Sequence, residues 1–162
     1  MEYSQCKTNS HSLALSYGIE NISSIIVGEK GSGANFTYET GINLDKAKKN
    51  MPNIDPLKLP ATVDFTVALN SNEMLLVELK LDCDNPNNLN NSKKRENLRR
   101  KIKDSESLLR CTNISKVRSE KVFVFKPEYV DIARNTISRI FLNRSNEILV
   151  LSEDLLFTKY FV

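Results

Sequence analysis

Two apolar segments separated by a short polar stretch form the clearest hydrophobic pattern in the chain. The first, residues 61–69, is rich in β-branched residues, and the second, residues 74–81, is almost continuously apolar. Residues 70–73 between them have the polar composition of a turn. This pattern predicts a β-hairpin, and the apolarity of the second strand indicates that it lies inside a sheet with both faces covered.

Helical and strand patterns alternate along the rest of the chain. Before the hairpin we predict a helix from about Ser12 to Ile26, a short strand at 35–38 and an irregular, proline-containing segment at 50–60. After it we predict a polar loop at 82–92 and a basic helix from about Ser92 to Leu109. A strand at 121–125, a helix opened by Pro127, a strand at 147–151 and a short apolar tail at 155–162 complete the order.

These elements predict one α/β domain covering residues 1–162, with a central mixed β-sheet flanked by helices. The two long helices each carry one apolar stripe that would pack on the sheet. The stripe residues are Leu98, Ile102, Leu108 and Leu109 in the basic helix, and Val130, Ala133, Ile137 and Ile140 in the later one.

The composition is that of a globular protein, with 40% hydrophobic and 27% charged residues among 162. No apolar run approaches the roughly 20 residues of a membrane-spanning helix, and the first residues lack the apolar block of a secretory signal. Three scattered cysteines, Cys6, Cys83 and Cys111, form neither a disulfide framework nor a zinc pair. We therefore expect a cytoplasmic protein with no membrane association.

The net charge is only +3, but basic residues concentrate between positions 93 and 110. Such a segment permits a polyanionic partner such as nucleic acid. The single histidine, His11, excludes two-histidine acid–base catalysis and the H-E-x-x-H zinc site, and we expect it to lie at the surface or to cap a helix.

Glu78 and Lys80 are charged residues within the otherwise apolar second strand of the hairpin. Because they are two residues apart, their side chains project from the same face of the strand. Buried charges are normally paired, bound to a metal or kept wet in a cleft. These two residues therefore point to a functional site.

Asp64 on the first strand joins them only in certain registers. In an antiparallel pair, opposed residues have a constant index sum and share a face. A sum of 142 sets Asp64 opposite Glu78 and a sum of 144 sets it opposite Lys80, whereas 143 sends it to the other face. The favourable sums require a connection of three or five residues, or a bulge.

In a favourable register, two carboxylates and one ammonium group converge. Hard oxygen ligands of this kind suit Mg²⁺ or Mn²⁺, which also take water and phosphate oxygens as ligands. Lys80 could orient or deprotonate the attacking water and offset charge on a phosphate.

Asp64 followed by the strand-borne Glu78-Leu79-Lys80 resembles the PD-(D/E)xK nuclease superfamily, over roughly residues 12–125. The resemblance implies a restriction-endonuclease-like fold, with Asp64 and Glu78 as metal ligands and Lys80 as the catalytic lysine. It also implies an acid on the first helix, for which Glu20 is the first candidate and Glu39 the second. Two further residues, Glu96 and Asn97, match a polar position that sometimes assists from the following helix, and Val63 replaces the proline of the motif.

The expected function is a metal-dependent nuclease, a hydrolase that cuts phosphodiester bonds of DNA or RNA. Double-strand cleavage would imply a homodimer, because one active site cuts one strand. The alternative is a non-enzymatic protein- or nucleic-acid-binding module on the same scaffold, such as a toxin-immunity protein, although the positive net charge argues against an inhibitor of basic nucleases. A third alternative is an unrelated α/β protein in which these charges have no common role.

Overall fold

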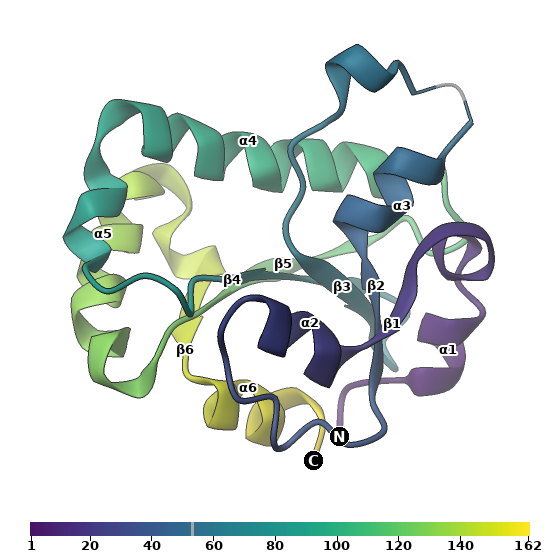
Figure 1. The fold of residues 1–162 in the computed structure, drawn as a ribbon, viewed down its shortest axis with the longest axis horizontal. Coiled ribbons are helices and arrows are strands. Elements are labelled where there is room, and N and C mark those ends of the chain that lie inside the picture. Colours follow the sequence, from purple (N-terminus) through teal and green to yellow (C-terminus); the bar gives the residue numbers. More distant parts are fainter. Residues whose placement is uncertain (53) are drawn as a thin grey trace.

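A six-stranded mixed β-sheet in the order β1-β2-β3-β4-β5-β6 forms the centre of the computed structural model, which describes residues 1–52 and 54–162 apart from the Ser16 side chain. Neighbouring strands from β1 to β4 are antiparallel, and β4, β5 and β6 are parallel. This confirms the predicted α/β class with a mixed sheet flanked by helices (Figure 1). The strands are β1 Ile19–Asn21, β2 Thr40–Asn43, β3 Phe65–Ala68, β4 Met74–Leu79, β5 Val117–Val124 and β6 Ile148–Leu151.

Helices cover both faces of the sheet. One face packs against α3 (Leu44–Asn50), α4 (Ser92–Leu109) and α5 (Val130–Ile140). The other packs against α2 (Ile22–Gly28) and α6 (Glu153–Tyr160), as Figure 1 shows below the sheet. The remaining short elements are α1 Gln5–Asn9, a π-helical turn Ala14–Gly18, and 3₁₀ turns at Pro56–Lys58, Pro86–Asn90, Pro127–Tyr129 and Leu142–Glu147.

Strand β4 is the interior strand that the sequence predicts, since all six of its residues are buried. Its alternate side chains point to opposite faces: Met74 and Leu76 belong to the cluster under α4, and Leu75, Val77 and Leu79 to the cluster over α2 and α6. Glu78 follows Met74 and Leu76 in this alternation, so its carboxylate points toward α4.

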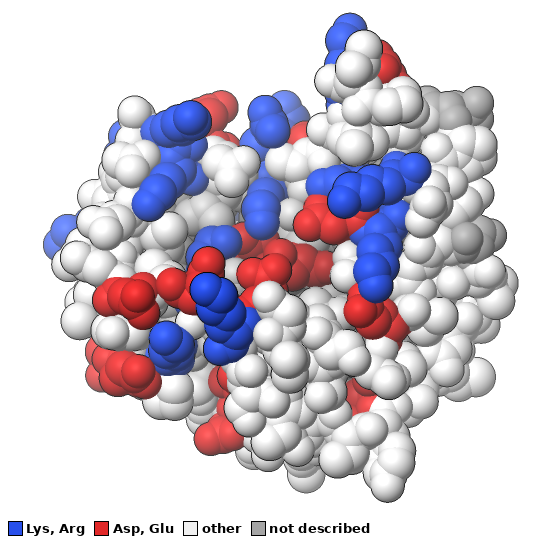
Figure 2. Space-filling view, in the orientation of Figure 1, with Lys and Arg blue, Asp and Glu red and all other residues white. Residues whose placement is uncertain are grey.

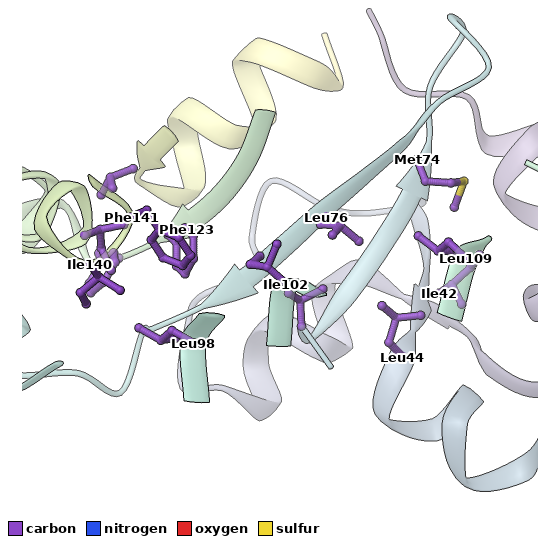
Figure 3. Close-up of a cluster of buried hydrophobic side chains, with 14 of the residues drawn as sticks. Ile42, Leu44, Met74, Leu76, Leu98, Ile102, Leu109, Phe123, Ile140 and Phe141 are labelled. Atoms are coloured by element: carbon purple, nitrogen blue, oxygen red, sulfur yellow. The ribbon is translucent and has the colours of Figure 1, made fainter. Parts of the chain in front are cut away.

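The predicted basic helix corresponds to α4, with the same boundaries. The Asn91 side chain caps it by accepting the Lys94 N–H at 2.9 Å. Leu98, Ile102 and Leu109 are buried in the cluster drawn in Figure 3, each contributing about 1.5–3 kcal/mol through burial. Leu108 is only partly buried, and the prediction for it was wrong in that respect.

The predicted helix from Ser12 to Ile26 is wrong in its middle. Residues 19–21 form β1, which pairs with β2, and only residues 22–28 continue as a helix. Gly18 precedes this strand, and a Cβ there would lie 2.8 Å from the Asn43 backbone oxygen. Pairing with β2 therefore uses backbone groups of residues 19–21 that a continuous helix would have bonded within itself.

His11 is fully buried, so the prediction of a surface position was wrong. Its Nδ1 accepts the Leu13 N–H at 3.2 Å, which is a local capping contact, and its Nε2 lies 3.2 Å from Thr112 Oγ1. Burial lowers the pKa of His11, although a backbone hydrogen bond with Ile114 opposes this.

The strand predicted at 35–38 is also wrong, because the strand in this region is β2 and it begins at Thr40. Phe36 is instead buried against Phe157 and Phe161. The N–H groups of Ser32 and Gly33 donate to the carboxylate of Glu153. Tertiary contacts with the C-terminal helix therefore hold this segment in a non-strand conformation.

Three short α-helices, α1, α3 and α6, were not predicted. Helix α3 follows β2 and is capped by Asn43, whose side chain accepts the Lys46 N–H at 3.1 Å. Helix α6 occupies the segment predicted as an apolar tail and is capped by Ser152. The later helix and strands were predicted correctly in place, with β5 extending to Val117 at its start.

Candidate active site

The register of the hairpin brings Asp64 and Glu78 together. Phe65 pairs with Val77 and Ala68 with Met74, a constant sum of 142, so the next pair outward is Asp64 and Glu78. Residues 69–73 form the connection between β3 and β4, a five-residue loop as one favourable case requires. Of the registers that the sequence left open, the one that sets Asp64 opposite Glu78 is therefore the one that forms, and both carboxylates lie on the α4 side of the sheet.

Glu78 is buried, with 1% of its surface exposed, and its carboxylate contacts two ammonium groups. Lys80 Nζ forms an ion pair with Oε1. Lys101 Nζ lies 2.7 Å from Oε1 and 3.0 Å from Oε2. A carboxylate buried this deeply requires such partners, because desolvation of an unpaired charge is strongly unfavourable.

Asp64 is less buried, with 11% of its side chain exposed. Its Oδ2 accepts the Leu79 backbone N–H at 2.6 Å, and its Oδ1 lies 3.9 Å from Lys101 Nζ. Burial, together with repulsion from the Glu78 carboxylate, raises the pKa of Asp64 to about 7, although Lys101 and the Leu79 hydrogen bond act in the opposite direction. Asp64 therefore exchanges a proton near neutral pH.

Lys101 is the central site residue that the sequence analysis missed. Burial lowers the pKa of its ammonium group, but the carboxylates of Glu78 and Asp64 outweigh burial and raise it. The signal was present in the sequence: Lys101 lies three residues after Leu98 and four before Ser105, both buried, so helical periodicity places a lysine on the core-facing side of α4.

Glu20 lies beside the pair, but on strand β1 and not on a helix. Its Oε2 accepts a hydrogen bond from Asn43 Nδ2 at 2.9 Å and lies 2.9 Å from Lys46 Nζ. Glu20 and Asp64 line a common pocket of about 160 Å³. The second candidate, Glu39, accepts the Tyr38 N–H at 3.1 Å and does not line this pocket.

Asp45 is a further acid in the same pocket that the sequence analysis missed, because helix α3 was not predicted. It accepts a hydrogen bond from Thr62 Oγ1 at 2.8 Å and forms an ion pair with Lys48. Burial raises the pKa of Asp45, but the contacts with Lys48 and Thr62 outweigh it, so the pKa is lowered.

The two polar candidates from the following helix lie in different places. Asn97 lines a pocket that also contains Lys80. Glu96 lines a separate surface pocket with Lys93 and Arg100 and does not line the Lys80 pocket. Asn97 is four residues before Lys101, so both are on one side of α4.

The donor set fits a divalent cation held by few protein ligands. Within residues 1–52 and 54–162, no three or more His, Cys, Asp and Glu side chains are arranged to hold a metal ion. Asp64 and Glu78 nevertheless form a cation-binding pair, since Lys101 is already bound to Glu78 and close to Asp64. Mg²⁺ commonly uses one or two carboxylates, with water and phosphate completing its shell.

Charges of both signs surround this site. Figure 2 shows acidic side chains gathered across the middle of one face, between the positions of α4 and α2 in Figure 1, with Lys and Arg side chains bordering them. An acidic centre with a basic border is suited to a cation together with a polyanion.

Comparison of the chain with known protein families, curated proteins and solved structures finds no match. The function is therefore inferred from the residues and geometry of the chain itself. None of the helices within the described ranges combines the length and apolar character that crossing a bilayer requires.

Proposed function

We propose that this chain is a metal-dependent nuclease that hydrolyses phosphodiester bonds of DNA or RNA. The observation that carries the proposal is the position of Asp64 opposite Glu78 across the β3–β4 hairpin, with Lys80 paired to Glu78. The order of elements adds support, since an acid-x-Lys strand followed by a helix is what the resemblance to the PD-(D/E)xK superfamily implies.

Asp64 and Glu78 would hold Mg²⁺ or Mn²⁺ in this proposal. When bound, such an ion polarises the phosphate and lowers the pKa of a coordinated water. Asp64 is suited to this role because the Leu79 N–H fixes its Oδ2, while Oδ1 is 3.9 Å from the nearest lysine ammonium. Glu78 is held in place by β4, whose other residues are buried on both sides.

Lys80 would orient the attacking water and offset charge on the phosphate. Its side chain is 19% exposed, its ammonium group is paired with Glu78, and the residue lines an open pocket. A divalent cation held by Glu78 would compete with Lys101, because the Lys101 ammonium group contacts both carboxylate oxygens of Glu78. Lys101 would also offset negative charge on a phosphate bound at this site.

A non-enzymatic binding module on the same scaffold is the second candidate. One observation favours it: two carboxylates and two ammonium groups already neutralise each other at the site. A toxin-immunity protein or nucleic-acid-binding subunit would use such a cluster only to stabilise the fold. We also propose a cytoplasmic location, and a homodimer in the case that the protein cuts both strands of a duplex.

Cleavage assays separate the two candidates. The purified protein is incubated with single- and double-stranded DNA and RNA in Mg²⁺, Mn²⁺ or EDTA, beside the variants Glu78→Gln, Lys80→Met and Lys103→Met. We expect metal-dependent cleavage that falls by about 100-fold or more in the first two variants. Lys103 is an exposed lysine of helix α4 that contacts neither Asp64 nor Glu78, so its variant should cleave as the unmodified protein does.

Two results would contradict the nuclease proposal. One is the lack of cleavage of every substrate with either metal. The other is cleavage that persists unchanged in Glu78→Gln and Lys80→Met, which would indicate a contaminating enzyme. Circular dichroism of each variant establishes that it is folded, so a loss of cleavage can be assigned to the site.

A further inference from the structure

A second pocket, of about 490 Å³, opens beside Lys80, where β4 ends and the following loop turns toward α4. Lys80 lines this pocket, and its neighbour Glu78 binds Lys101. The pocket is therefore adjacent to the candidate active site, with Lys80 common to both. Its volume is within the range of pockets that hold small organic ligands.

The cationic part of the pocket comes from two elements. Lys80 stands at the end of β4, and Lys94 comes from the first turn of α4. Lys94 is followed at helical spacing by Asn97, also in the pocket, and then by Lys101, which contacts Glu78. One side of α4 thus connects the pocket to the paired carboxylates, with an ammonium group at each end.

The remaining lining combines amides with an apolar floor. Asn88 and Asn97 contribute side chains that form no hydrogen bond with any residue in the described part of the chain. Leu89 and Leu98, which are 6% and 2% exposed, add apolar surface to the same lining. Amides that offer both donors and acceptors above an apolar surface are suited to a nucleobase, whose edge is polar and whose faces are not.

Two acids, Asp82 and Asp84, also line the pocket beside its lysines. Asp84 is paired with Lys126, whose Nζ lies 3.4 Å from its Oδ1. Asp82 is exposed at the start of the loop and provides an acceptor for the amino group of a base.

We propose that this pocket binds one unpaired nucleotide of the substrate, next to the phosphate at Glu78 and Lys80. The base would contact Asn88 and Asn97, and its phosphate would contact Lys94. Because a base within a duplex is stacked and paired, such a pocket favours single-stranded or frayed nucleic acid. The inference rests on the proposed function, since it names the class of substrate for the same site.

Binding without metal tests the pocket separately from cleavage. The probes are a short fluorescein-labelled single-stranded DNA, the RNA of the same sequence, and the blunt DNA duplex, all measured by fluorescence anisotropy in EDTA. The variants are Lys94→Ala and Asn97→Ala. Lys103→Ala is the matched control, because Lys103 is an exposed lysine of the same helix that does not line the pocket.

We expect the DNA or RNA single strand to bind about tenfold more tightly than the duplex. Lys94→Ala and Asn97→Ala should each weaken single-strand binding by roughly tenfold, and Lys103→Ala by less than about twofold. Equal losses in Lys94→Ala and Lys103→Ala would overturn the proposal, since they would indicate diffuse electrostatic attraction. Tighter binding of the duplex, or no binding of any probe, would also overturn it.

The failure of the nuclease proposal would look different. In that case no probe is cut in Mg²⁺ or Mn²⁺, while the single strand still binds in EDTA and still loses affinity in Asn97→Ala. Cleavage that depends on Glu78 but is unaffected by Asn97→Ala, with no change in single-strand affinity, would overturn the pocket alone.

Discussion

The ammonium group of Lys101 contacts both carboxylate oxygens of Glu78, at 2.7 and 3.0 Å, and lies 3.9 Å from Asp64. A cation supplied by helix α4 therefore occupies the position between two opposed acids of the sheet. This arrangement stabilises the buried charge of Glu78, and a divalent cation proposed at these carboxylates would compete with Lys101.

The competition predicts how Lys101→Met changes metal binding. Without the ammonium group, Mn²⁺ no longer has to displace a bound cation from Glu78, so we expect its affinity to rise by about tenfold or more. Isothermal titration calorimetry measures this, with Lys103→Met as the control. Weaker Mn²⁺ binding in Lys101→Met would show that Lys101 assists the metal site and does not compete for it.

The same variant should be less stable in the absence of metal. Glu78 would keep only Lys80 as a charged partner, and we expect the free energy of unfolding to fall by about 1–3 kcal/mol. Urea denaturation in EDTA measures the change, and saturating Mn²⁺ should restore part of the loss. A variant as stable as the unmodified protein would mean that Lys80 alone is sufficient to stabilise the buried carboxylate of Glu78.

The raised pKa of Asp64 predicts a pH dependence of stability. Its pKa is about 7 in the folded protein against 3.8 ordinarily, so the folded state retains a proton that the unfolded chain has released. The contribution of Asp64 to stability is therefore complete below about pH 4 and is lost as pH rises to about 7. Urea denaturation in EDTA between about pH 4 and about pH 8 should show a smaller decline in Asp64→Asn than in the unmodified protein. Identical pH dependence of the two proteins would contradict the assignment.

Glu20 and Glu39 provide a matched pair of acids for the nuclease proposal. Glu20 shares the acidic pocket with Asp64, whereas Glu39 lies outside it. We expect Glu20→Gln to reduce metal-dependent cleavage by about tenfold and Glu39→Gln to leave it unchanged. Since the ion pair of Glu20 with Lys46 is partly exposed, the stability of Glu20→Gln should change by less than about 1 kcal/mol. Equal cleavage activities of the two variants would show that Glu20 does not contribute to the active site.

Two glycines test the packing that positions Glu20. A Cβ at Gly18 would lie 2.8 Å from the backbone oxygen of Asn43, the residue whose side chain holds Glu20. We expect Gly18→Ala to lower the free energy of unfolding by about 1–3 kcal/mol. Gly28→Ala is the control, because a Cβ there meets nothing within 4 Å, and it should be neutral or stabilise by up to about 1 kcal/mol. Thermal or urea denaturation compares them, and equal effects would contradict the close approach at Gly18.

Local pattern was sufficient to predict much of the fold. The β3–β4 hairpin and helix α4 were predicted because their information lies within each segment. The hairpin has β-branched or apolar runs around a polar turn, and the helix has an apolar stripe at helical spacing. The residues Asp64, Glu78 and Lys80 followed from the same reasoning, since strand alternation determines which side chains share a face.

The sequence by itself determined the strand that carries Glu78, the two helices that connect β4, β5 and β6, and the set of registers that could bring Asp64 to Glu78. Strand β4 ends at Leu79, so Lys80 lies directly after it and not within it as predicted. Only the tertiary structure decided which register forms, that Glu20 lies on a strand, and that Lys101 contacts Glu78. These features depend on contacts between residues far apart in the chain. Residues 19–21 have helical spacing of their own but pair with β2, and Lys101 reaches the acids only because α4 packs across the sheet. The free energy of such contacts arises only when distant segments pack together. The residue pattern of one segment therefore could not predict them.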